Sequence, residues 1–520
     1  MKIMKERQNL LIKIVLALVT VGLINLIFYF GFFRFDLTAN KIYSLSKASK
    51  KLVSKFDDYI IIRAVFSKVL PEQFKFVRIY VEDILKEYRA SSRGKIKFEF
   101  IDPQQPKSKL SEQEVQSMGI IPVEFTVVEK DKFEIKKGYM GLAMLYKDKK
   151  EVIPVINNIE TLEYDITSAL KRLTVKDKKT IGILRSHRSN TLLDEKYTQF
   201  RQQMNKFYIL NEVDISTESM ANTDALVIIS PKENLEDKEL FYLDQYILSG
   251  KPVAFLLSRY NINLQTFWAV KIYSNIFDLL SHYGIDINEG LIADYQCQRV
   301  SITSRHMFFV MTNVVEYPYM PIITKLNKTH PLVKNISQVV LPFVSSINIK
   351  SGLEQINYTI LMETSKYSFI KKDVYSINPL TVDFRMPKDA QRGPFIVGVE
   401  LKGKFKSFYE KEEKFKELKL NLKDYLKETP SDKESRILVI STGDFVEQEL
   451  GLLANVFDYL GQEQDLLYIR SKNVTPPPIR VMSATFKVIY RYFVMILPAL
   501  LVVAFGLLRW YYRKNQVVQL

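Results

Sequence analysis

The sequence predicts an α/β protein with an apolar segment at each end. Over most of the 520 residues, short apolar runs typical of strands alternate with stretches whose apolar residues recur at helical spacing. Two longer apolar runs lie near the ends, and the whole chain is 47% hydrophobic and 25% charged, as in ordinary globular proteins. A chain of this length is large enough for two or three domains with their own cores.

The apolar run at residues 14–33 contains no charge, and a second run follows at residues 492–508. A helix of about 20 residues spans about 30 Å, the thickness of the hydrocarbon layer of a bilayer. We therefore expect a transmembrane helix at the end of segment 1–34 and another at 492–508. A cleaved signal peptide is the alternative for the first run, but its apolar core would be only about 7–15 residues long, and a small-residue cleavage site would follow.

Basic residues beside the two runs predict the sidedness. Several Lys and Arg residues precede the first run, and more occur in the tail at 509–520. The positive-inside rule places both tails in the cytoplasm. The expected location is the inner (cytoplasmic) membrane, with two passes and a large extracytoplasmic domain.

After a connector at residues 35–57, residues 58–175 predict a first α/β domain. The expected elements are, in order, a buried strand at 59–66, a helix opened by Pro71, an alternating strand at 96–102, a hairpin and a helix at about 160–173. This order resembles a thioredoxin-like domain, and Pro122 falls where that fold has a cis proline. The loop SKVLP at 67–71 has no cysteine, so a thiol oxidoreductase is excluded.

Residues 176–475 predict a larger, Rossmann-like α/β domain with β insertions. Its apolar strands are expected at 180–185, 207–215, 225–230 and 252–257, with helices at 197–205 and 237–248. This alternation implies a mostly parallel sheet covered by helices on both faces. The remaining expected features are irregular β structure at about 300–404, a solvated Lys- and Glu-rich helix and loop at 402–436, a strand at 436–442 and a Pro-rich spacer at 476–491.

The composition limits the partners and the chemistry. The net charge is +16, and a basic body is attracted to an anionic membrane or glycan, although a lysine-rich proteome explains the charge equally well. No basic motif with interleaved aromatic residues indicates nucleic acid binding. Cys297 is the only cysteine, which excludes an intrachain disulfide and a cysteine-based metal site.

Known catalytic motifs are missing from the sequence. No GxxxxGK[ST] occurs, because Gln245 stands where the first glycine before Gly250-Lys251 belongs, so ATP hydrolysis is not expected. The four histidines are scattered, and we expect no metal and no cofactor. Ser186 and His187 are adjacent and would point to opposite faces of an extended strand, which argues against a catalytic pair.

Two further features of the larger domain have a functional and a structural interpretation. The domain is similar to class I glutamine amidotransferase-like and related cysteine hydrolases, which need a cysteine on a glycine-rich elbow. Cys297 has no flanking glycine, which favours a structural thiol. Gly443-Asp444 follows a strand at the end where α/β sheets bind ligands, and a simple turn is the alternative. We therefore do not expect an enzyme.

Several short motifs in the N-terminal part are distinctive: FDLTANKIYSLS after the first apolar run, FIDP at 100–103, GIIPV at 119–123 and LEYDITSALKRLT at 162–174. With HPLVKNI at 330–336, these motifs resemble the gliding-motility-type ABC transporter auxiliary components (GldG-like). The residues that the resemblance marks as structural or partner-binding are Asp36, Leu37, Thr38, Tyr43, Ser44, Asp102, Pro103, Pro122, Glu163, Tyr164, Asp165, Thr167 and Ser168.

The resemblance implies an integral membrane subunit whose exported body works beside a separate ABC ATPase and a separate polytopic permease. It also implies an amidotransferase-like domain used for binding, shared with an intraflagellar transport subunit. We therefore expect a non-catalytic accessory subunit of an export or gliding-motility ABC transporter, in contact with membrane lipid and envelope partners. One alternative is a membrane-tethered binding protein for an anionic envelope glycan or lipid that acts without a transporter, and another is a membrane-anchored hydrolase.

Overall fold

The structure is a computed structural model, which describes residues 44–409 and 433–461 and a few isolated positions nearer the two ends. Within these ranges it leaves out residues 69, 130–131, 157, 160, 175–176, 307–308, 335, 351, 353–354 and 373. The chain separates into two compact units, Met1–Asn473 and Val474–Leu520. All the elements below belong to the first unit.

The described residues contain no helix that is both long enough and apolar enough to cross a bilayer. The longest described helix, α3 (Glu72–Ser91), has 20 residues, but charged residues recur along it and it packs on a sheet. This finding corrects the prediction of two flanking transmembrane helices and, with it, the predicted two-pass location in the inner membrane. Most of residues 14–33 and 492–508 lie outside the described part of the chain.

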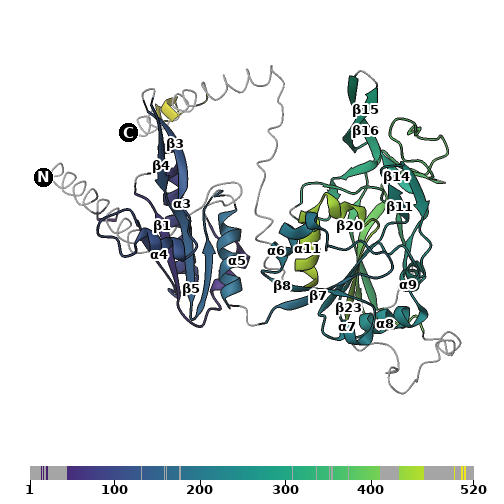
Figure 1. The fold of residues 1–520 in the computed structure, drawn as a ribbon, viewed down its shortest axis with the longest axis horizontal. Helices are drawn as coiled ribbons and strands as arrows, with labels where there is room; N and C mark the ends of the chain where they lie inside the picture. The colour runs from purple at the N-terminus through teal and green to yellow at the C-terminus, as the bar shows by residue number, and fades with distance from the viewer. Residues whose placement is uncertain are drawn as a thin grey trace, which may run out of the picture. The chain divides into compact units, whose positions relative to one another are not determined.

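A four-stranded sheet lies in the N-terminal part (Figure 1). Its strands are, in spatial order, β2 (Ile96–Ile101), β1 (Ile60–Phe66), β5 (Met140–Tyr146) and β6 (Lys149–Ile153). β1 is parallel to β2, and the helix α3 makes the crossover that this parallel pair needs. β5 is antiparallel to β1 and also to β6, to which a tight turn connects it.

Both faces of this sheet are covered. Alternate residues of β1, such as Ile60 and Ile62, pack against α2 (Lys47–Val53), α3 and α5 (Leu162–Thr174). Val65 packs on the other face in a smaller apolar cluster with Val115 of α4 (Glu112–Ser117). β3 (Val123–Glu129) and β4 (Lys132–Gly138) form a separate hairpin.

The peptide bond before Pro122 is trans. Among the described residues the cis bond is Gly393-Pro394, so the cis proline expected at Pro122 is a further correction.

The larger sheet lies in residues 179–461, which we call the large-sheet region. Five of its strands are parallel and occur in the order β8 (Tyr208–Val213), β7 (Lys179–Leu184), β9 (Ala225–Ile229), β10 (Val253–Leu256) and β23 (Ser435–Ile440). An antiparallel part continues the sheet through β22 (Ile396–Gly403), β19 (Ile347–Ile349) and β13 (Ile285–Ile287), and β20 (Ile356–Glu363) also pairs with β22. The parallel strands overlap those expected from the sequence.

Helices cover this sheet on two sides (Figure 1). α6 (Thr198–Met204) and α11 (Leu450–Leu460) contribute to one apolar cluster, in which the rings of Phe200 and Phe457 lie 5.8 Å apart. α7 (Thr217–Ala221), α8 (Asp237–Leu248) and α9 (Ile276–His282) contribute to the other. Every residue of β9 and β10 is buried, as expected for strands covered on both faces.

The β insertions add short sheets with their own apolar cluster. The pairs are β11 (Tyr260–Asn263) with β12 (Trp268–Lys271), β14 (Leu291–Asp294) with β21 (Ser368–Lys371), and β15 (Cys297–His306) with β16 (Phe309–Ile323), which also pairs with β18 (Val339–Val340). Most of the Lys- and Glu-rich run expected at 402–436 lies outside the described residues, although β22 extends into its start.

Candidate functional site

The carboxyl ends of the parallel strands form the first candidate site. The strand order reverses between β7 and β9, and α/β sheets bind ligands in the crevice outside the strand ends at such a point. Polar residues follow these strands directly: Ser186-His187 after β7, Ser230 after β9, Ser258 after β10 and Asp444 after β23.

A hydrogen-bonded network closes the end formed by β9, β10 and β23. The Ser258 hydroxyl donates to Asp444 Oδ2 over 2.8 Å and accepts the Gly443 amide over 2.9 Å. The Ser258 amide in turn donates to Ser230 Oγ over 2.8 Å. Burial raises the pKa of Asp444 to about 6, although the Ser258 hydrogen bond and the nearby Lys232 act in the opposite direction.

Gly443 shows how tightly these loops pack. A Cβ atom at this position would lie 2.4 Å from Ser230 Oγ and 2.8 Å from the Leu256 carbonyl oxygen. Both are closer than van der Waals contact, so a side chain here would push the loops apart. The Gly-Asp pair predicted from the sequence therefore belongs to a turn filled by the chain's own groups.

The contact between Ser186 and His187 corrects the prediction that these side chains do not meet. His187 Nδ1 lies 2.8 Å from Ser186 Oγ, and His187 Nε2 lies 2.9 Å from Glu239 Oε2. The reason is the backbone: His187 has a φ of 59° and Arg188 a φ of 51°, so the pair lies in a left-handed turn and not in an extended strand.

Hydroxyl, imidazole and carboxylate groups in this order occur in hydrolases, but Glu239 has a structural task. Its Oε2 accepts the amide of Glu236 over 2.8 Å and so completes a capping box at the start of α8. His187 therefore ties the turn after β7 to the first turn of α8.

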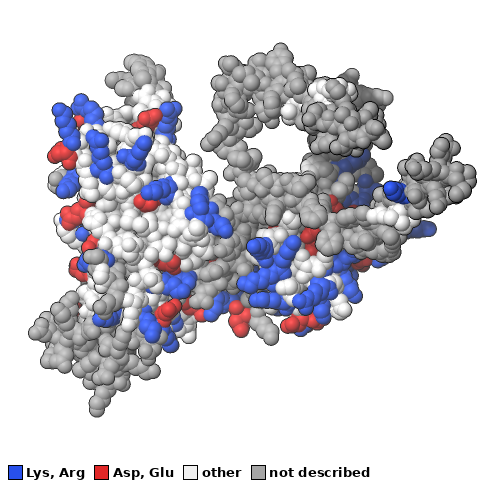
Figure 2. Space-filling model, turned by 180° about the vertical axis from the view of Figure 1, so that it is seen from behind, with Lys and Arg blue, Asp and Glu red and all other residues white. Residues whose placement is uncertain are grey.

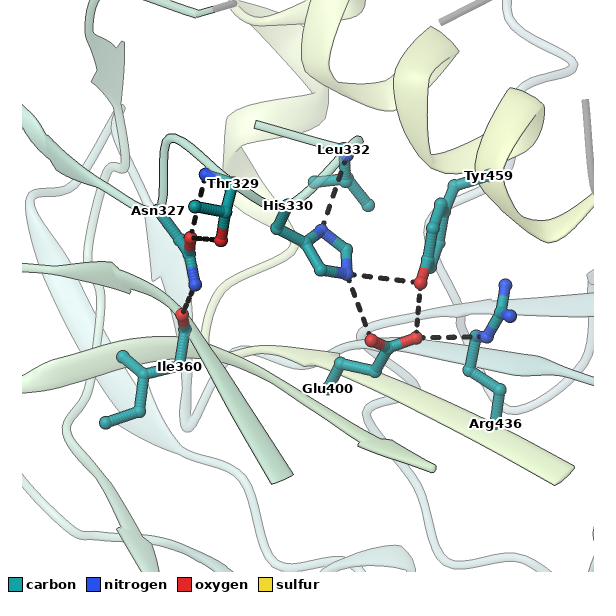
Figure 3. Close-up of polar contacts among 8 residues, drawn as sticks. All are labelled: Asn327, Thr329, His330, Leu332, Ile360, Glu400, Arg436 and Tyr459. Carbon is teal, nitrogen blue, oxygen red and sulfur yellow. Dashed lines mark hydrogen bonds and ion pairs between the residues drawn. The ribbon is translucent and has the colours of Figure 1, made fainter. Parts of the chain in front are cut away.

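A buried ionic cluster forms the second candidate site (Figure 3). Glu400 of β22 lies at its centre, with Oε2 3.0 Å from His330 Nε2 and Oε1 accepting the Tyr459 hydroxyl over 2.6 Å. Arg436 Nε lies 3.0 Å from Glu400 Oε1, an ion pair whose N–H direction does not meet hydrogen-bond geometry. The side chains of His330 and Glu400 are only 8% and 7% exposed.

The cluster links elements that lie far apart in the sequence. Glu400 comes from β22, Arg436 from β23, Tyr459 from α11, and His330 from the turn after the short strand β17 (Lys325–Leu326). Burial alone would raise the pKa of Glu400, but hydrogen bonds from His330 and Tyr459 and the charge of Arg436 lower it overall. The Arg436 guanidinium also lies 4.5 Å above the Tyr459 ring.

His330 has a defined orientation in the cluster. Its Nδ1 accepts the Leu332 amide over 3.3 Å, so Nε2 carries the hydrogen that faces Glu400. The turn that holds it is fixed by Asn327, whose side chain accepts the Thr329 amide and donates to the Ile360 carbonyl (Figure 3). The sequence motif HPLVKNI indicated His330, but it carried no sign of Glu400, Arg436 or Tyr459.

The motif residues of the N-terminal part form a third polar cluster. The carboxylate of Glu163 on α5 accepts the Ser46 amide over 2.7 Å and the Ser49 hydroxyl over 2.6 Å. Thr167 Oγ1 lies 3.0 Å from Ser49 Oγ and 2.5 Å from the Tyr88 hydroxyl. These bonds join α2, α3 and α5 beneath the surface.

Three further predicted site residues, Asp102, Asp165 and Ser168, lie in other surroundings. Asp102 accepts the amides of Lys68 and Gln104, and Asp165 accepts the Thr161 hydroxyl. The Ser168 hydroxyl is buried and has no hydrogen-bond partner among the described residues. Of the rest, Ser44, Pro103, Pro122 and Tyr164 lie within the described residues, whereas Asp36, Leu37, Thr38 and Tyr43 lie outside them. A partner-binding role for the set stays a prediction.

Metal binding and thiol chemistry have little support in the described residues. No group of three or more His, Cys, Asp or Glu side chains among them is arranged to hold a metal ion. Cys297 lies on β15, and burial raises the pKa of its thiol, which disfavours a reactive thiolate. Lys and Arg are spread over the face in Figure 2 with Asp and Glu between them, so the positive charge there is not one continuous patch.

Comparisons with known proteins identify the family. A family model described as an ABC-type uncharacterized transport system matches residues 178–468, and a domain of unknown function matches residues 39–145. An uncharacterized protein of Borreliella burgdorferi is 26% identical over 533 residues, covering 98% of this chain and 99% of the relative. The mmIFT52 N-terminal domain is similar over 54% of this chain and 97% of that chain, with 11% identity and a TM-score of 0.32.

The first match covers more than half of the chain, and it confirms the family predicted from the sequence motifs. The chain therefore belongs to the family of auxiliary components of an ABC-type uncharacterized transport system, and it has an accessory role in such a system.

Proposed function

We propose that this chain is a non-catalytic accessory subunit that binds partners and draws its energy from a separate ABC ATPase, beside a separate permease. The observation that supports this proposal is the closed carboxyl edge of the parallel sheet. At the place where related folds hold phosphate groups, the chain presents the network of Ser230, Ser258 and Asp444 and the contact between His187 and Glu239.

The charges at this edge disfavour a nucleotide. Phosphate sites in α/β folds use free backbone amides and an unpaired positive charge. Here Arg185 is paired with Asp214 and Arg188 with Glu233, so both arginines beside the β7 turn are neutralised, and the third cation, Lys232, lies near the Asp444 carboxyl. The Gly443 amide already donates to Ser258. A phosphate at this edge would displace existing bonds and meet the Asp444 carboxyl.

The test combines purification with an activity measurement. An affinity-tagged chain is isolated in a mild detergent, which keeps a permease in solution, and the copurifying proteins are identified by mass spectrometry. We expect an ABC ATPase and a permease to copurify. ATP hydrolysis should depend on the ATPase subunit and should be lost when its phosphate-binding lysine is replaced.

The matched control is the chain purified alone. If it hydrolyses ATP by itself, the proposed non-catalytic role is wrong. If neither transporter subunit copurifies under conditions that preserve other ABC complexes, the proposed partners are wrong.

A further inference from the structure

A groove of about 810 Å³ lies in the β insertions of the large-sheet region, and its lining includes none of the residues that form the candidate sites above. One wall is the hairpin of β11 and β12, and the other walls include the turn at 288–290, β19, and β21 with the segment that follows it. Its volume is within the range of about 300–1,000 Å³ that is typical of ligand sites.

Large aromatic side chains at this groove are held out in solvent. Trp268 is 58% exposed, Tyr273 71% and Tyr375 65%, and all three line the groove. Val270, which is 62% exposed, lies two residues from Trp268 on β12 and so shares its strand face. Tryptophan and tyrosine are the residues that most often dominate the binding energy of protein interfaces.

The backbone that carries these rings is fixed. The amide of Ala269 donates to the Tyr375 carbonyl over 2.8 Å, and the amide of Ile377 donates to the Phe267 carbonyl over 2.9 Å. At the turn, Gly290 has a φ of 99°, and a Cβ atom there would lie 2.7 Å from the Lys371 carbonyl oxygen. The groove therefore exists before any partner arrives, which lowers the entropy cost of binding.

The charge at the groove is positive. Lys271 forms an ion pair with Glu289, which also lies 3.9 Å from Arg259. Lys372 lines the groove and makes no hydrogen bond or ion pair with any described residue. Among the described residues that line the groove, the basic Lys271 and Lys372 outnumber the acidic Glu289. Arg259 lies next to Glu289, and its buried Nε has no hydrogen-bond partner within the described part of the chain. This imbalance is complementary to an acidic ligand.

We propose that this groove binds an acidic peptide segment of a partner protein that also carries aromatic or aliphatic side chains. Such side chains would pack between the rings of Trp268 and Tyr375, and a carboxylate would lie next to Lys372. The apolar groups Val270, Ile370 and Val374 line the same groove and favour amino-acid side chains over a hydroxyl-rich sugar. The inference rests on the proposed function only in taking the chain to act by binding.

The test uses Trp268 as its own reporter. The chain has two tryptophans, so Trp510→Phe in the full chain leaves Trp268 as the only one. This variant is titrated with a random copolymer of glutamate and tyrosine while tryptophan is excited selectively. We expect a saturable change in Trp268 fluorescence. Polyglutamate, which carries the charge without the rings, should bind at least about tenfold more weakly.

Matched variants locate the binding. Tyr375→Ser and Lys372→Glu in the Trp510→Phe background should each weaken binding about tenfold. The controls Tyr367→Ser and Lys366→Glu change the same residue types at exposed positions outside the groove and should bind as before. Equal losses in the controls, or unchanged binding in the groove variants, would overturn the proposal.

Two other probes give outcomes that also decide the question. Hyaluronan fragments, as an anionic glycan, should not compete with the copolymer, and competition at the same concentration would assign the groove to sugars instead. If polyglutamate bound with the same affinity as the copolymer, the aromatic rings would contribute nothing to binding, and the aromatic part of the proposal would be wrong. Because the titration needs no transporter subunit, its failure is distinct from a failure of the ATPase and permease to copurify.

Discussion

Asp444 and Glu400 are two enclosed carboxylates of the large-sheet region, and they differ in what holds them. Asp444 accepts a neutral hydroxyl from Ser258, and burial raises its pKa from 3.8 to about 6. Glu400 is held by His330, Tyr459 and Arg436, and these partners outweigh its burial and lower its pKa. The comparison teaches that the donors decide whether such a carboxyl group favours folding as the acid or as the anion.

The two groups should therefore give stability opposite dependences on pH. Asp444 has a raised pKa in the folded state, so its contribution is fully present below about 3.8 and is lost as the pH rises through about 6. Glu400 has a lowered pKa, so its contribution is present above its unfolded pKa near 4.5 and is lost as the pH falls through the folded pKa.

Glu400→Gln should have the largest effect. The change keeps the size of the side chain but leaves Arg436, which is 18% exposed, beside a neutral amide. Removing one partner of a buried ion pair costs about 3–5 kcal/mol, because the remaining charge stays buried without compensation. Urea unfolding at neutral pH, followed by Trp268 fluorescence in the Trp510→Phe background, measures the loss.

The pH dependence supplies the control for this prediction. The loss caused by Glu400→Gln should shrink as the pH falls, because the native carboxylate itself becomes protonated. A loss that stays constant down to the lowest pH at which the protein folds would contradict the assigned role of the charge.

Asp444→Asn should stabilise the protein at neutral pH by about 1–3 kcal/mol, since it removes a charge that burial disfavours. The amide oxygen of asparagine can still accept the Ser258 hydroxyl. The gain should disappear below about pH 4, where the native carboxyl group is already protonated. Urea unfolding over this pH range checks both statements.

The matched control for this variant is Asp444→Ala, which removes the charge together with the acceptor for Ser258. It should gain less than Asp444→Asn. If the asparagine variant is less stable than the wild type at neutral pH, the charged form of Asp444 does not destabilise the folded protein as its raised pKa implies.

Tyr459→Phe should weaken the Glu400 cluster by about 1–2 kcal/mol. It removes the hydroxyl that donates to Glu400 Oε1, but the ring over Arg436 and the ion pair remain. The effect should be smaller than that of Glu400→Gln, and the same unfolding measurement compares them. An equal effect would mean that the hydroxyl, and not the charge, holds the cluster together.

The elements of the large sheet were predictable because their signal is local. β9 and β10 are short apolar runs between polar turns, and burial on both faces requires that composition. The ionic cluster was not predictable in the same way. Glu400 lies in a strand of mostly apolar residues, and His330 and Tyr459 lie 70 and 59 residues away from it in the sequence.

The contact between Ser186 and His187 was missed for a conformational reason. The prediction assumed an extended strand, in which neighbouring side chains point to opposite faces. A φ of 59° at a residue other than glycine is uncommon, and although histidine is enriched in this conformation, one histidine in RSHRSN is too weak a signal to predict it. The predicted Gly-Asp turn at 443–444 was easier, because these residue types themselves favour turns.

Glu316→Gln should have the smallest effect. It tests whether burial is the reason that an ion pair at Glu400 contributes more to stability than an exposed one. Glu316 pairs with Arg299 across β15 and β16 over 3.1 Å, but the two side chains are 64% and 70% exposed. Water and salt screen such a pair, so its loss should cost at most about 1 kcal/mol and less at high salt. The same residue change at Glu400 removes a pair whose two side chains are only 7% and 18% exposed. If urea unfolding gave the two variants equal losses, the donors and burial around Glu400 would not explain its contribution.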